Sequence, residues 1–175
     1  MSAPAVTVPP GRASPAGRLI AVNATVCLLL LIQYLLGMVA NLFVALPAHP
    51  GAGASDYLTG SASGLAWLIS DGPAWAAAHA AFGMALALAA LATIAVTWRQ
   101  GSRTATGTSV LGALAIVGAG FNGASFLDYG HDFSSMIMAG LWGLALACYL
   151  AGVLLAVRRP SPGPASADGP ARSMR

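Results

Sequence analysis

Four long stretches without a charged side chain constrain this chain more than any other feature. They cover about residues 19–46, 73–98, 108–126 and 133–157. A helix needs about 20 predominantly apolar residues, with a range of about 17–25, to cross about 30 Å of hydrocarbon. All four stretches are long enough. We therefore predict an all-α polytopic membrane protein, built as an up-down four-helix transmembrane bundle.

The composition agrees with this prediction. The chain is 57% hydrophobic and only 7% charged, whereas a soluble domain has about 25% charged residues. These values exclude an ordinary soluble enzyme, and they also exclude a disordered chain, which needs low hydrophobicity and high charge. The eight basic residues, all arginine, are too scattered to form the continuous basic face of a nucleic-acid-binding protein. We expect the lipid bilayer as the main partner and no nucleic acid.

The first stretch could also be considered as a cleaved signal peptide. The apolar part of a signal peptide has about 7–15 residues, and the stretch over residues 19–46 is much longer. It also contains Asn23, Gln33 and Asn41, which suit a helix packed inside a bundle. We expect it to be retained.

The arginines predict the orientation. They precede the first stretch, lie between the second and third, and follow the fourth, so four crossings place them on one side. The positive-inside rule makes that side cytoplasmic. We expect a multi-pass protein of a bacterial cytoplasmic membrane with both termini inside, flexible cytoplasmic tails over residues 1–17 and 160–175, and a transmembrane domain over 18–159. The outer loop, residues 48–72, is long enough to cap the bundle.

Local signals suggest where two spans begin. Pro73 suits the first position of a helix, so we predict Asp71 or Gly72 as the N-cap of the second span. Asp132 is the corresponding cap before the fourth span.

Small residues recur at helical spacing and suggest close helix packing. The second span offers His79, Gly83, Ala87 and Ala90; the third offers Gly112, Ala115, Ala119 and Gly123; the fourth offers Ala139, Gly143, Ala147 and Ala151. Such faces let helices approach closely in lipid. We favour packing inside the bundle; the alternative is association with a membrane-protein partner or a second copy through one of these faces.

Histidine and methionine side chains gather toward the outer end. His79 is the only ionisable residue deep inside a span, which makes it a functional candidate. Imidazole and thioether groups ligate haem and also suit copper. We therefore consider a haem b or copper site at His79 with Met136 or Met138, and we add His131 as a cofactor-binding candidate and His49 and His131 as metal-ligand candidates.

Further polar residues complete a predicted outer pocket around His79, namely Gln33, Asn41, Asn122 and Asp128. Other interpretations remain open. His79 could hydrogen-bond Gln33, Asn41 or a backbone carbonyl, the methionines could be apolar filling, and Asp128 could serve a turn.

Catalytic signals are missing from the sequence. There is no HExxH or CxxC motif and no pattern typical of a Ser/His/Asp triad, so we assign no catalytic residue and lean against an enzyme. Cys27 and Cys148 lie within spans, and we interpret them as small buried residues.

Two segments carry a resemblance to a known family. Residues 33–38 (QYLLGM) and 78–83 (AHAAFG) resemble helices of one four-helix half of haem A synthase, and the whole chain resembles small four-helix bacterial membrane proteins. In haem A synthase such a histidine ligates haem, so the resemblance implies that His79 is a haem ligand. That family has a glutamate and often cysteines in its first outer loop, and residues 48–72 contain neither.

Three hypotheses follow for function. The first is a haem- or copper-binding accessory of a redox or assembly system. The second is a structural or partner-binding membrane subunit without a cofactor. The third is a small transporter, which is weaker because proton or ion relays normally need several ionisable groups inside the membrane.

Overall fold

The computed structural model describes residues 14–47, 56–129 and 132–158. They form five helices and, within these ranges, no strand: α1 (Pro15–Phe43), α2 (Tyr57–Ser70), α3 (Ala74–Arg99), α4 (Arg103–Tyr129) and α5 (Asp132–Val157). All except α2 are long and apolar enough to cross a membrane. The prediction of an all-α protein with four transmembrane helices is confirmed.

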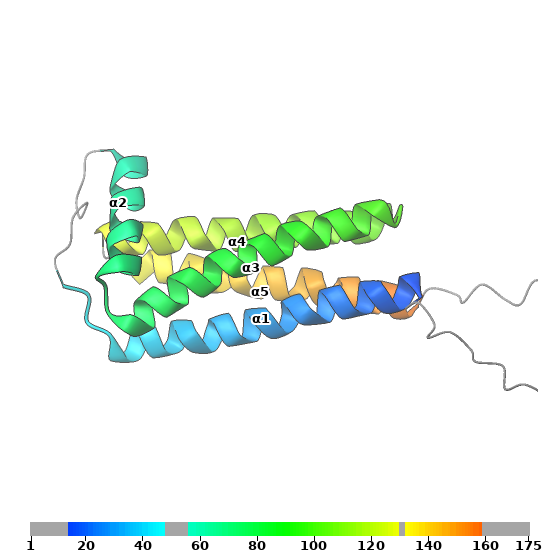
Figure 1. Cartoon of the computed structure of the whole chain (residues 1–175), viewed down its shortest axis with the longest axis horizontal. Helices are drawn as coiled ribbons and strands as arrows, with labels where there is room; N and C mark the ends of the chain where they lie inside the picture. Colours follow the sequence, from blue (N-terminus) through cyan, green and yellow to red (C-terminus); the bar gives the residue numbers. More distant parts are fainter. Residues whose placement is uncertain (1–13, 48–55, 130–131, 159–175) are drawn as a thin grey trace, which may run out of the picture.

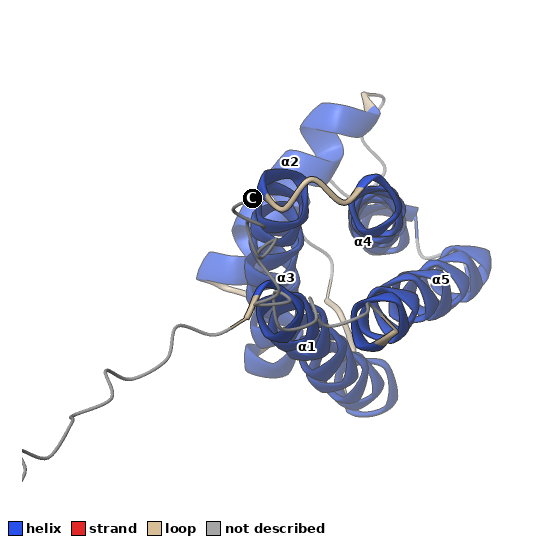
Figure 2. Cartoon of the chain, turned by 90° about the vertical axis from the view of Figure 1, so that its right-hand side faces the viewer, coloured by secondary structure: helices blue, strands red, loops and turns tan. Residues whose placement is uncertain are grey.

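The four long helices form an up-down bundle (Figure 1). Around the bundle their order is α1, α3, α4 and α5, and α5 packs against α1 to close the ring (Figure 2). Helices that are diagonal to each other, α1 with α4 and α3 with α5, make no close backbone contact in the described part of the chain.

Helix α2 crosses one end of the bundle and packs against α3 and α4 (Figure 1). It therefore lies where the sequence predicted a capping loop. Asp56 caps its first turn by accepting hydrogen bonds from the hydroxyl and the backbone N–H of Thr59. Both bonds lower the pKa of the Asp56 carboxyl, and the bond from the hydroxyl has the larger effect. They do so because they stabilise the charged form of the carboxyl.

Helix α1 begins and ends earlier than predicted. It begins at Pro15 because the Ser14 hydroxyl caps the first turn and proline fits the first helical position. It ends at Phe43, before the predicted boundary at Leu46. The helical backbone conformation is disfavoured for a residue that precedes a proline, and Leu46 precedes Pro47.

The predicted cap of α3 was wrong. Pro73 itself occupies the N-cap position, and no side chain caps this helix. Asp71 instead closes α2, since its backbone N–H donates to the carbonyl of Trp67. Asp71 lies two residues before Pro73, which occupies the N-cap position of α3.

Helix α4 is longer than the predicted apolar stretch of residues 108–126 at both ends. Its first turns are polar and begin at Arg103, so a search for apolar residues does not detect them. Toward its other end α4 continues through the glycine-rich segment of residues 118–123 and ends at Tyr129.

The core is built from the inner faces of the four long helices, with Val26, Leu30, Leu86, Ile116 and Tyr149 among its buried members. Cys27 and Cys148 are also buried, and neither is in a disulfide. Their interpretation as small buried residues is confirmed.

Several glycines receive large side chains of a neighbouring helix. A Cβ added to Gly112 on α4 would lie 2.7 Å from the ring of Tyr149 on α5, and one added to Gly152 would overlap the Asn23 amide of α1. Because glycine has no side chain, these positions allow the helices to pack closely. The predicted packing role of small residues is therefore confirmed at Gly112, and Gly152 plays the same role without having been predicted.

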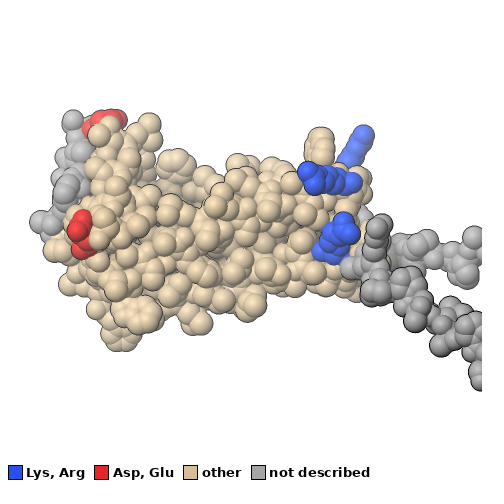
Figure 3. Space-filling model, viewed as in Figure 1, with Lys and Arg blue, Asp and Glu red and all other residues tan. Residues whose placement is uncertain are grey.

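Charged side chains separate to opposite ends of the bundle (Figure 3). We call the end where α1 begins and α5 ends the Arg end; its described basic residues are Arg18, Arg99, Arg103 and Arg158. The opposite end, which carries α2, we call the Asp end; its described acidic side chains are Asp56, Asp71 and Asp128.

Candidate functional site

Polar side chains in the half of the bundle near the Asp end meet at two places. Gln33 of α1 contacts His79 of α3, and Ser61 of α2 contacts Asp128 of α4. The first contact lies between two membrane-spanning helices, and the second attaches α2 to the bundle.

The Gln33 side chain reaches both the backbone and the ring of His79. Its amide nitrogen donates to the His79 carbonyl oxygen at 3.2 Å and lies 3.2 and 3.3 Å from the two ring nitrogens. A carbonyl oxygen only accepts hydrogen bonds, so the group facing it must be the amide NH₂. The hydrogen-bonding interpretation of His79 is confirmed.

Two glycines make this contact reciprocal. A Cβ added to Gly37, one turn after Gln33, would lie 2.9 Å from Cε1 of His79. A Cβ added to Gly83, one turn after His79, would lie 3.0 Å from the Gln33 amide nitrogen. Each polar side chain therefore lies on a glycine of the facing helix, and the arrangement fixes the register of α1 against α3.

The contact defines the surroundings of the His79 ring. A metal ligand needs the lone pair of a ring nitrogen, and the Gln33 amide nitrogen is the described polar neighbour of both ring nitrogens.

The predicted methionine ligands lie elsewhere. Met136 is 62% exposed, and the Met138 sulfur packs beside Gly123 of α4. Helices α3 and α5, which carry His79 and the two methionines, are diagonal in the bundle and make no close backbone contact in the described part of the chain. Within the described ranges no three His, Cys, Asp or Glu residues form a group able to hold a metal ion. Haem and copper binding stay predictions.

The other predicted pocket residues do not converge on His79. Asn41 is exposed near the end of α1, and the Asn122 amide donates to the Gly118 carbonyl of its own helix at 3.0 Å. His49 and His131 lie outside the described residues.

Asp128 is held under α2. The residue is 7% exposed, and its Oδ2 accepts a 2.8 Å hydrogen bond from the Ser61 hydroxyl. Oδ1 is buried with no hydrogen-bond partner among the described residues. The hydroxyl of Tyr57 also ties α2 to α4, since it donates to the Phe121 carbonyl at 2.8 Å.

Ser61 and Tyr57 were not predicted from the sequence as contact residues. One signal was present: Gly60, Gly64 and Leu68 recur at intervals of one helical turn, and all three are buried. This spacing predicts a helix with one face against the bundle.

The small-residue face of α5 differs from those of α3 and α4. Gly83 and Gly112 meet side chains of neighbouring helices, whereas a Cβ added to Gly140 or Gly143 would meet no atom within 4 Å. Ala139 and Ala147, on the same side of α5, are exposed. This outward face of α5, made of Ala139, Gly140, Gly143 and Ala147, is unpartnered within the described chain.

No protein-family model matches the chain, and no curated protein or solved structure matches it significantly.

Proposed function

We propose that this protein is a structural membrane subunit that associates with a second copy of itself through the outward face of α5. The observation that supports the proposal is the difference between its glycines. The spaces beside Gly83 and Gly112 are filled by side chains of neighbouring helices, whereas the spaces beside Gly140 and Gly143 are open.

A lipid environment favours association through such a face. Helices in a bilayer gain little from hydrophobic burial, so close packing of small residues drives their association. A two-fold axis parallel to the bundle brings the same face of two copies together and keeps both Arg ends on one side. The exposed Leu144 and Leu150 flank the open glycines and add contact area.

The experiment compares two outward glycines. Gly143→Leu fills the proposed interface, and Gly120→Leu adds the same side chain to an open position on α4. In liposomes holding donor- and acceptor-labelled copies, we expect energy transfer between wild-type copies. It should be lost in Gly143→Leu and kept in Gly120→Leu.

Gly83→Leu separates association from folding. Its side chain would enter the Gln33–His79 contact, and overpacking of this kind costs about 1–3 kcal/mol. We expect Gly83→Leu to lower bundle stability, whereas Gly143→Leu should leave it nearly unchanged. Monomeric wild-type protein, or equal loss of energy transfer in Gly120→Leu, would contradict the proposal.

We also propose that the Arg end faces the cytoplasm, so that both termini are inside. The separation of arginine from aspartate along the bundle (Figure 3) supports this orientation, because basic residues are retained on the cytoplasmic side. Labelling of Ser102→Cys and Ser70→Cys by a membrane-impermeant thiol reagent in intact cells tests it. We expect labelling only at Ser70→Cys.

A further inference from the structure

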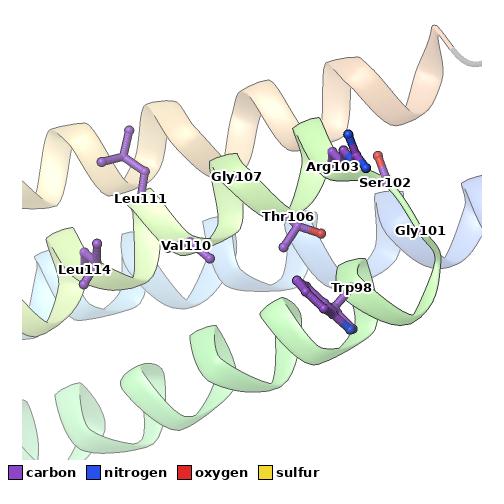
Figure 4. Close-up of a pocket in the computed structure, with 9 residues that line it drawn as sticks. All are labelled: Trp98, Gly101, Ser102, Arg103, Thr106, Gly107, Val110, Leu111 and Leu114. Carbon is purple, nitrogen blue, oxygen red and sulfur yellow. The ribbon is translucent and has the colours of Figure 1, made fainter.

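An open groove of about 630 Å³ lies at the Arg end, between the last turn of α3 and one side of α4 (Figure 4). Its polar part is formed by residues near the helix connection, and its apolar part continues along α4. Its lining includes Trp98, Arg103, Gly107, Val110, Leu111 and Leu114.

The mouth of the groove carries a positive charge without a described counterion. Arg103 is the first residue of α4, where the helix dipole adds partial positive charge. The described acidic side chains all lie at the Asp end. An anionic group at the mouth would therefore be attracted by Arg103.

The groove has the length of one membrane leaflet. Leu114 lies about 16 Å along α4 from Arg103, at about 1.5 Å per residue, and half of the hydrocarbon core is about 15 Å thick. Trp98, at the mouth, is 75% exposed, and tryptophan favours the interface between headgroups and hydrocarbon. The apolar wall of Val110, Leu111 and Leu114 then runs from the interface toward the middle of the bilayer.

We propose that this groove binds one anionic phospholipid of the leaflet at the Arg end, with its phosphate at Arg103 and an acyl chain along Val110, Leu111 and Leu114. The two-part character of the groove favours a lipid, because a free anion would use only the mouth. Basic pockets between transmembrane helices are known to bind anionic headgroups. The proposal concerns α3 and α4 and does not depend on association through α5.

The role of the Arg103 charge is tested by measuring, with native mass spectrometry, how phosphatidylglycerol binds to the full-length protein in a non-ionic detergent. A basic residue near an anionic lipid surface contributes about 1 kcal/mol, so Arg103→Gln should weaken binding about fivefold. Arg158→Gln removes an exposed arginine at the same end but outside the groove, and it should bind like the wild type. Equal weakening by both variants would mean diffuse attraction and overturn the proposal.

The shape is tested at two open glycines of α4. Gly107 lines the groove, Gly120 does not, and a Cβ at either would meet no atom within 4 Å. Gly107→Phe should abolish retention of the lipid, and Gly120→Phe should preserve it. Retention in Gly107→Phe, equal binding of phosphatidylcholine, or displacement of the lipid by an equal concentration of inorganic phosphate would overturn the proposal.

Discussion

The side-chain amide nitrogen of Gln33 on α1 lies 3.2 Å from the backbone carbonyl oxygen of His79 on α3. The same amide nitrogen is within hydrogen-bonding distance of both nitrogens of the His79 ring. Gly37 and Gly83 provide the space for this arrangement. The contact joins two membrane-spanning helices and uses the one histidine that the sequence places deep inside a span.

A double-mutant cycle measures this contact. Hydrogen bonds between transmembrane helices contribute about 0.6 kcal/mol on average and about 1.7 at most. The hydrogen bond from Gln33 to the backbone carbonyl of residue 79 remains in His79→Ala, so the cycle measures only the contact with the His79 ring, and we expect a coupling near the lower value. Stabilities of the wild type, Gln33→Ala, His79→Ala and the double variant in a detergent titration give the coupling. Strictly additive losses would show that the two side chains do not interact.

The Ser61–Asp128 hydrogen bond should hold α2 in place. Ser61→Ala removes the one described partner of the buried Asp128 carboxyl, and loss of a partner by a buried polar group costs about 1–3 kcal/mol. We expect faster hydrogen exchange throughout α2. Ser63→Ala is the control, because the Ser63 hydroxyl bonds only to carbonyls of its own helix. Equal exchange in both variants would contradict the role of Asp128.

The N-cap of α2 should weaken in acid. Hydrogen bonds from Thr59 lower the pKa of Asp56 below its ordinary value of 3.8. Its contribution to stability is therefore present above the ordinary pKa and is lost as pH falls through the lowered one. An NMR titration of the Thr59 amide should have its midpoint below 3.8. Asp56→Asn, which caps without titrating, should abolish that transition; a midpoint at or above 3.8 would refute the cap.

Haem or copper binding is tested by absorption spectra of protein purified after expression with ample haem and copper. That hypothesis predicts a haem band or bound copper that is lost in His79→Ala. Colourless, metal-free wild-type protein would exclude His79 as a ligand.

Features that depend on one helix alone could be predicted from the sequence. The spans are long and uncharged, so their number followed from the thickness of a membrane. The contact of His79 with Gln33 was one of several alternatives, and choosing it required the packing of α1 against α3. Ser61 and Asp128 are far apart in the chain, and nothing in the local pattern pairs them.

The role of the small residues could be predicted only in part. The spacing on α5 is like that on α4, yet Gly112 is filled by Tyr149 and Gly143 is open. Which face of a helix is covered depends on the order of the helices around the bundle, and periodicity in one helix does not contain that order. The open face of α5 therefore emerged only from the assembled fold.

Disulfide crosslinking in membranes tests the association through α5 most directly. Gly143→Cys is placed in a background of Cys27→Ala and Cys148→Ala and is oxidised in native membranes. A disulfide forms only when the two Cα atoms come within about 7 Å, so the proposed interface predicts a covalent dimer from Gly143→Cys and none from Gly120→Cys on α4. Absence of a dimer at Gly143→Cys, or an equal yield at Gly120→Cys, would contradict association through this face.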